Sequence, residues 1–187
     1  MAEIQQVTLL SINFFKISIS DWNVKKEQIL SLIDLYNEDK RIDCCYSDYF
    51  MYNNRPEYMP KIVGMIADEL QEFINQSGIS VYPVNQWQMW SQRYINGDFH
   101  GVHNHGFGHL SAILYVEFDK DKHQSTRFYT PIPNAFTGVI DNLQPDVEEG
   151  DLILFPSTIL HECPPSNCPE SRTIVAFNIP IGENVQT

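Results

Sequence analysis

Hydrophobic and polar positions follow helical and strand periods in the first part of the chain. Residues 7–19 alternate as in a strand. Two later stretches repeat apolar residues every three or four positions, which predicts helices over residues 24–37 and 60–76. Asp21 and Asn23 are candidate N-caps of the first helix, and Gly78 is a candidate C-cap of the second. We therefore expect residues 1–78 to supply one strand and supporting helices.

The second part of the chain has the pattern of a β-domain. Short apolar runs between Gly, Pro and Asn predict strands over residues 86–95, 110–118, 126–130, 151–155 and 172–179. Helices followed by strands, without βα alternation, favour an α+β chain. Its core, about residues 79–182, should be an antiparallel sandwich or barrel. We expect residues 1–187 to form a single domain.

A polar, tyrosine-rich stretch without periodicity, residues 40–58, lies between the two predicted helices. It predicts a long loop, and long loops in compact domains often cover or line a binding site.

Charge and cysteine content restrict the partners and the compartment. The 12 basic and 24 acidic residues give a net charge of −12, which should repel a nucleic acid backbone. The N-terminus lacks the pattern of a signal peptide, and no apolar run predicts a membrane span, so a cytoplasmic protein is expected. We interpret the four cysteines as reduced thiols. A zinc site formed by Cys163, Cys168 and His161 is the less favoured reading, because both cysteines flank prolines in what reads as a surface turn.

Histidines cluster in the segment FHGVHNHGFGH, which holds four of the six in the chain. In an extended segment His103 and His105 point to the same side and can bind one metal ion. His161 follows an apolar strand and a Phe-Pro-Ser turn, where it can supply a third ligand at the rim of a β-domain. Without further context, a solvated loop or a surface position explains these histidines as well. We expect His100 to face away from His103, and His109 to lie near the mouth of the site.

Arg172 opens the last predicted strand and shares a face with Ile174, Ala176 and Asn178. A cation at the inner end of an apolar strand needs a partner, which is either a ligand carboxylate or a structural salt bridge. Ser111 and Tyr115 share the face of another strand, and Tyr94 precedes the histidines. Taken singly, these aromatic residues are more typical of a core than of a ligand contact.

Taken in order, these elements resemble the Fe(II)- and 2-oxoglutarate-dependent oxygenases. The closest likeness is to a branch with an H-x-H and a distant His, similar to prolyl hydroxylases, and it covers residues 90–180. The matching elements are Trp90, Tyr94, Gly97 and Asp98; His103 and His105; Leu110, Ser111 and Tyr115; Gly150, Asp151, Leu152, Phe155, Pro156, Ser157 and His161; and Arg172, Phe177 and Asn178. The resemblance implies a double-stranded β-helix core, the jelly-roll fold shared with cupins.

The resemblance also implies roles for these residues. His103, His105 and His161 would bind Fe(II), and Arg172 would bind the distal carboxylate of the cosubstrate 2-oxoglutarate. The remaining cosubstrate contacts would come from Tyr115, Tyr94 and Ser111. The implied reaction consumes O2 and 2-oxoglutarate, releases succinate and CO2, and hydroxylates an unactivated C–H bond of a peptide or a small molecule.

One position departs from the wider superfamily, which has Asp or Glu where His105 stands. Three neutral imidazoles would leave the full 2+ charge on the iron before the cosubstrate binds. Halogenating relatives also lack the carboxylate but have a small residue there, and the bulk of His105 favours ligation instead.

Two other classes of function remain open from the sequence. A redox-inert cupin-like isomerase or a sugar-binding module could hold zinc or manganese with the same histidines, and an interaction protein would not use them. Neither needs Arg172, so this residue separates the oxygenase hypothesis from the alternatives.

Overall fold

The computed structural model describes residues 11–33, 40–42 and 44–182. The first strand, β1 (Phe15–Ser18), covers the end of the strand predicted over residues 7–19, of which residues 7–10 lie outside the described part. No described helix is long and apolar enough to cross a membrane.

Three α-helices follow β1. Helix α1 (Trp22–Leu32) begins two residues before the predicted start at residue 24. Asp21, one of the two candidate N-caps, precedes it, but the Asp21 side chain makes no capping hydrogen bond. Residues 34–37 of this predicted helix lie outside the described part. The helix predicted over 60–76 is divided into α2 (Met59–Met65) and α3 (Ala67–Ser77), because Ile66 leaves helical geometry with φ −115° and ψ 17°. Gly78 ends α3 in the left-handed conformation predicted for its C-cap, with φ 68°.

The strands form two antiparallel sheets. One is six-stranded, in the order β1-β8-β5-β10-β3-β2, and the other is four-stranded, in the order β4-β9-β6-β7. The strands after β1 are β2 (Tyr46–Ser47), β3 (Gln88–Tyr94), β4 (His100–His103), β5 (His109–Glu117), β6 (Arg127–Tyr129), β7 (Asn142–Leu143), β8 (Asp151–Pro156), β9 (His161–Cys163) and β10 (Arg172–Pro180). Two short 3-10 helices lie at Tyr52–Asn54 and Val84–Gln86. All five strands predicted in the second part are present, whereas β4, β7 and β9 were not predicted.

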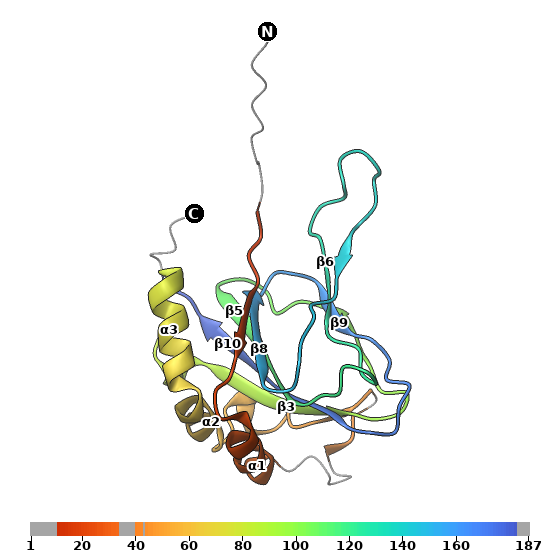
Figure 1. Ribbon diagram of the computed structural model, residues 1–187. Coiled ribbons are helices and arrows are strands. Elements are labelled where there is room, and N and C mark those ends of the chain that lie inside the picture. The colour runs from red at the N-terminus through yellow and green to blue at the C-terminus, as the bar shows by residue number, and fades with distance from the viewer. Residues whose placement is uncertain (1–10, 34–39, 43, 183–187) are drawn as a thin grey trace.

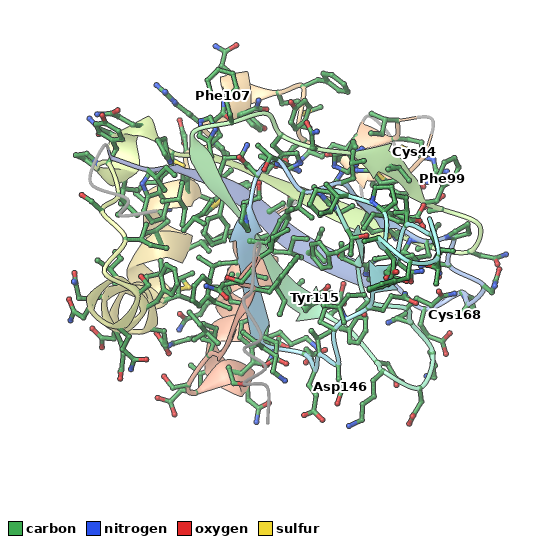
Figure 2. The ribbon with its side chains drawn as sticks, turned by 90° about the horizontal axis from the view of Figure 1, so that it is seen from above. Cys44, Phe99, Phe107, Tyr115, Asp146 and Cys168 are labelled. Carbon is green, nitrogen blue, oxygen red and sulfur yellow. The ribbon has the colours of Figure 1, made fainter. Side chains whose placement is uncertain are left out.

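Alternate residues of the six-stranded sheet face two different cores. On β10, Val175 and Phe177 pack in a cluster with the helices, and Ile174 and Ala176 pack in a second cluster between the sheets. Figure 1 shows α2 and α3 beside the outer face of the large sheet, with β6 and β9 across from it. In the view from above, Tyr115 lies in the interior and Phe107 at the rim (Figure 2). The helices thus cover one face of the sheet and leave the other face for the site.

Candidate metal centre

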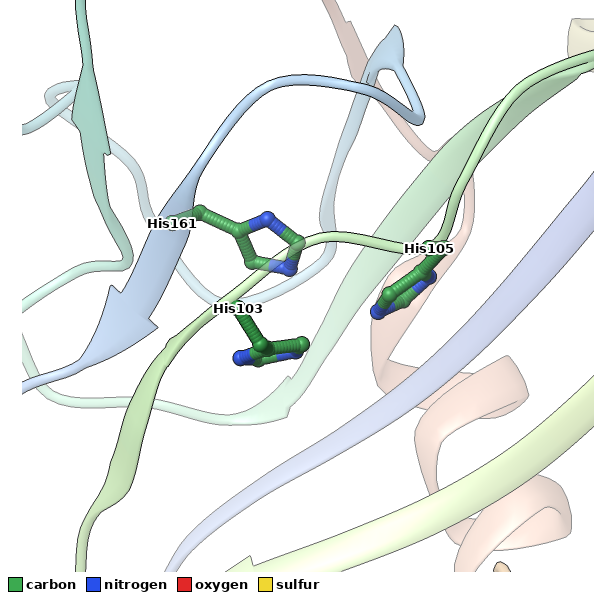
Figure 3. Close-up of side chains that lie close together, drawn as sticks. All are labelled: His103, His105 and His161. Atoms are coloured by element: carbon green, nitrogen blue, oxygen red, sulfur yellow. The ribbon is translucent and has the colours of Figure 1, made fainter.

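Three histidines converge at one end of the space between the sheets (Figure 3). His103 is the last residue of β4, His161 is the first of β9, and the two are direct partners in the antiparallel pairing. His105 lies two residues beyond β4. One ring nitrogen from each histidine lies within 4.8 Å of the others. The β4–β9 pairing therefore joins two parts of the chain that are far apart in sequence.

Hydrogen bonds orient all three imidazoles in the same way. The Nδ1 of His103 lies 2.7 Å from the Gly101 carbonyl oxygen, and that of His161 lies 2.9 Å from the Ile159 carbonyl oxygen. The Nδ1 of His105 lies 2.8 Å from Oδ1 of Asn178. Each of these oxygens can only accept, so each Nδ1 carries the proton and each Nε2 has a free lone pair. This is the tautomer that a metal ion requires from three Nε2 ligands.

Burial keeps the three rings neutral. Burial lowers the pKa of His103 and His105 below the ordinary value. Burial and the neighbouring His103 together lower the pKa of His161 to about 3. At neutral pH the cluster therefore presents three uncharged nitrogen donors. Within the described residues, no carboxylate or thiol joins this metal-binding group, which excludes the Cys163, Cys168 and His161 reading there.

His100 does not face away from the cluster, and that expectation is wrong. Its ring stacks on His103 with centroids 4.0 Å apart, because an irregularity in β4 between the two residues changes the register. Burial lowers the pKa of His100 to about 4, and its Nδ1 lies 3.3 Å from Nε2 of Gln92. His100 therefore lies beside the three donors without joining them.

Arg172 is buried, with 2% of its surface exposed. One guanidinium nitrogen, Nη2, donates to Oγ1 of Thr126 at 3.0 Å, and Nη1 donates to Sγ of Cys163. Among the residues that the structure describes, its Nε has no hydrogen-bond partner. No salt bridge to Arg172 forms within the described ranges, where the carboxylates all lie farther than 4.0 Å. A structural ion pair, one of the two readings of Arg172, is therefore not found there.

Two of the three residues expected beside the cosubstrate lie against Arg172. Its guanidinium carbon is 5.3 Å from the ring centre of Tyr94 and 5.6 Å from that of Tyr115. The Tyr115 hydroxyl donates to Oγ1 of Thr126 at 3.1 Å. Ser111 lies elsewhere, because its Oγ is 3.1 Å from Nδ1 of His105 and donates to Oδ1 of Asn178 at 2.9 Å.

The sequence did not single out Thr126, and it indicated Cys163 only for the less favoured zinc site, although both residues contact Arg172. Thr126 begins a predicted strand, and Cys163 stands two residues after His161 on the same short strand. The spacing H-x-C is the signal that could have placed Cys163 on the side of His161. The strand itself is too short for its alternation to be recognised.

Two cavities meet at the histidines. An inner cavity of about 20 Å³ reaches from the cluster toward Tyr94, Thr126 and Cys163. An outer groove of about 410 Å³ is lined by His100, His103 and His105 on one side and by Tyr49 and Phe50 on the other. All three histidines therefore line the inner cavity, whose residues Thr126 and Cys163 contact Arg172. His103 and His105 also line the outer groove.

The fold is that of known oxygenases. A prolyl-4-hydroxylase from Pseudomonas putida superposes with a TM-score of 0.56 at 16% identity, over 91% of this chain and 93% of that one. The viral collagen prolyl hydroxylase from Paramecium Bursaria Chlorella virus-1 gives 0.57 at 13% identity, over 91% and 96%. HygX from Streptomyces hygroscopicus, with nickel and 2-oxoglutarate bound, gives 0.59 at 11% identity, over 90% and 83%. These likenesses confirm the predicted double-stranded β-helix.

The sequence gives an independent match to a family. Residues 88–178, from the start of β3 to near the end of β10, match the family described as "Putative 2OG-Fe(II) oxygenase". No curated protein sequence matches the chain. The matched segment contains all three histidines and Arg172, and it confirms the resemblance noted in the sequence. The segment from β3 to β10, residues 88–178, thus matches a family of 2-oxoglutarate- and Fe(II)-dependent oxygenases.

Proposed function

We propose that the protein is an Fe(II)- and 2-oxoglutarate-dependent dioxygenase of the hydroxylase type, with His103, His105 and His161 as its iron ligands. One observation carries the assignment of these residues. Three neutral imidazoles with free Nε2 lone pairs lie beside a buried guanidinium that has an unpartnered nitrogen. The donor set suits a divalent metal ion with open coordination positions, and the guanidinium suits a carboxylate.

When bound together, Fe(II) and 2-oxoglutarate supply the activation of O2 that hydroxylates a C–H bond, with release of succinate and CO2. The chain's own residues orient the reactants. Asn178 and the two backbone carbonyls hold the imidazoles, while Arg172 binds the distal carboxylate of the cosubstrate, beside Tyr94 and Tyr115. Ser111 contributes through His105 rather than by direct contact with the cosubstrate.

The inner cavity is small for this cosubstrate. A volume of about 20 Å³ holds about one water molecule. Nη1 of Arg172 is also bonded to the Cys163 thiol. Binding of 2-oxoglutarate therefore requires the Cys163 side chain to leave the guanidinium, so that a carboxylate oxygen takes the place of the sulfur.

We also propose that the protein acts in the cytoplasm on a peptide or a small molecule. Its cysteines 44, 45, 163 and 168 are all free thiols, which a reducing compartment preserves. The outer groove gives such a substrate access to the histidines.

Metal content tests the ligand assignment. Protein reconstituted with Fe(II) without oxygen and then desalted should retain about one iron per chain, as three protein ligands predict. His161→Ala should retain little iron, because it removes one of three Nε2 donors. His100→Asn is the matched control, since His100 stacks on His103 but donates nothing to the cluster, and it should retain iron fully. Equal loss in both variants, with both folded by circular dichroism, would show that the ligand set is misassigned.

A further inference from the structure

The outer groove beside the histidines has an unusual lining for so acidic a chain. The protein carries 24 acidic and 12 basic residues, but none of the described residues that line the groove is Asp, Glu, Lys or Arg. The lining beyond the histidines consists of aromatic and aliphatic residues and of four side-chain amides. The amides are those of Gln88, Gln92, Asn104 and Asn178. A cationic group entering this groove would lose water without gaining an opposite charge from the described lining residues, which costs free energy.

Aromatic rings form a continuous row from the surface to the metal centre. Phe50 and Tyr49 have ring centres 5.1 Å apart, and Tyr49 and Trp90 are again 5.1 Å apart. Trp90 in turn lies 5.3 Å from His105. The outer ring, Phe50, is 79% exposed, so folding alone does not account for its position. Exposed aromatic rings beside a groove are typical of binding surfaces.

The segment that carries Tyr49 and Phe50 is fixed to the large sheet. The buried carboxylate of Asp48 accepts hydrogen bonds from the Ser91 backbone nitrogen at 2.8 Å and from the Tyr58 hydroxyl at 2.6 Å. Because Ser91 lies next to Trp90 on β3, these bonds set the distance between the two walls. The groove is therefore already formed before a ligand binds.

Two of the amides have donors left for a ligand. Oε1 of Gln88 accepts from Nδ2 of Asn178 at 3.2 Å, and Oδ1 of Asn104 accepts from the Gly106 backbone nitrogen at 3.1 Å. Within the described part of the chain, Nε2 of Gln88 and Nδ2 of Asn104 donate to no protein atom. A matching ligand therefore offers carbonyl oxygens together with uncharged apolar groups.

We propose that this groove binds an uncharged segment of peptide, whose backbone carbonyls accept from Gln88 and Asn104 and whose side chains pack on the Phe50–Tyr49–Trp90 row. The proposal rests on the proposed function, because it treats the groove as the substrate side of the metal centre. A volume of about 410 Å³ is enough for a few residues of such a segment. Lysine or arginine at the reacting position finds no counter-charge among the described lining residues and is disfavoured there.

Affinity selection with mass spectrometry tests the proposal without any turnover. The zinc-loaded protein is incubated with pools of N-acetylated, C-amidated hexapeptides whose central residues are all uncharged, all acidic or all basic. We expect the uncharged pool to be retained about tenfold over the basic pool, which corresponds to about 1.4 kcal/mol. The acidic pool measures direct ligation of the zinc by carboxylates. Tyr49→Ala should reduce this retention about tenfold, as loss of a central aromatic contact does.

Two further variants sharpen the result. Phe136→Ala is the matched control, because Phe136 is 99% exposed on the β6–β7 loop and lies outside the groove, and it should leave retention unchanged. Gln88→Glu keeps the acceptor for Asn178 and adds one negative charge, so it should shift retention toward the basic pool. Equal retention of all pools, or retention that Tyr49→Ala leaves unchanged, overturns the peptide proposal. Since zinc replaces iron and no cosubstrate is present, that outcome leaves the oxygenase assignment standing.

Discussion

At the scale of single residues, the orientation of His105 depends on its contact with Asn178. The Nδ1 proton of His105, one of the proposed ligands, is accepted by Oδ1 of Asn178 and by Oγ of Ser111. We interpret Asn178 as a positioning residue, because it acts on the metal only through His105. Neighbours of this kind fix the tautomer and the ring orientation of a metal ligand.

Replacement of Asn178 tests this role. Asn178→Ala should weaken metal binding about tenfold to a hundredfold, because Nδ1 of His105 loses its main acceptor. Asn178→Asp keeps the acceptor and should retain most of the affinity. The dissociation constant of Co(II), followed by its visible spectrum, measures both. If the Asp and Ala variants lose affinity equally, Asn178 serves only in packing and the positioning role is wrong.

Cys163 offers a second residue-scale prediction, on the cosubstrate side. Cys163→Ala removes the sulfur that bonds to Nη1 of Arg172, so the guanidinium no longer has to leave it. We expect 2-oxoglutarate to bind about fivefold to tenfold more tightly, since hydrogen bonds to charged groups contribute about 1.5 kcal/mol or more. Calorimetry on the zinc-loaded protein measures this constant. Cys168→Ala provides the control, and unchanged binding in Cys163→Ala would mean that the thiol does not compete with the cosubstrate.

The convergence of the three histidines was easier to predict from the sequence than the contacts around them. Residues two apart, such as His103 and His105, keep to one side in extended chain, and this holds without knowledge of the fold. The position of His100 could not be predicted, because the irregularity in β4 is set by pairing with β9. Thr126 and Asn178 contact Arg172 and His105 only through tertiary structure.

At the scale of elements, the long strands were predictable, whereas the short strands β2, β4, β7 and β9 were not. Strands β3, β5, β8 and β10 are long enough to show their apolar character in the sequence. By contrast, β4 and β9 span four and three residues, too few for a pattern, but they carry two of the proposed ligands. The division of the predicted second helix at Ile66 also had no sequence signal, because the apolar spacing continues through it.

The N-terminal elements are tied to α3 by Glu69, and this contact predicts a pH dependence. Burial alone would raise the pKa of Glu69, but hydrogen bonds from Ser20 and Lys25 outweigh burial and lower the pKa from 4.5 to about 2. As pH falls, the Glu69 carboxylate therefore takes up a proton in the unfolded chain before it does so in the folded protein. The contribution of Glu69 to stability is lost between about pH 4.5 and pH 2.

Urea unfolding of Glu69→Gln measures this contribution. At pH 7 the variant should lose about 2 kcal/mol of unfolding free energy, the contribution of charged hydrogen bonds. The difference from the wild type should shrink as the pH approaches 2, where Glu69 itself is protonated. A difference that stays constant across this range would assign the loss to packing instead of charge. Glu72→Gln is a control on the same helix, since Glu72 only accepts from Gln76 at an exposed site.

At the scale of the whole molecule, two cavities adjoin the histidines of the proposed metal centre. The small cavity between the sheets includes Thr126 and Cys163, which contact Arg172, whereas the groove is uncharged among its described lining residues. The overall fold could be predicted because helices precede strands without alternation and because the motifs occur in the order of a known family. The groove as a whole could not be predicted, because its described lining residues meet only after folding. They include Ile42, Tyr49, Phe50, Gln88, Trp90, Gln92 and Asn104.

The proposed function requires that the three histidines bind Fe(II) and that Arg172 binds the distal carboxylate of 2-oxoglutarate beside it. The most direct measurement is the visible charge-transfer absorption that appears when 2-oxoglutarate is added to the Fe(II)-reconstituted protein without oxygen. We expect this band for the wild type. For Arg172→Ala we expect the band only at a much higher cosubstrate concentration. Absence of the band in the iron-loaded wild type, or an undiminished band in Arg172→Ala at limiting 2-oxoglutarate, would contradict the proposed function.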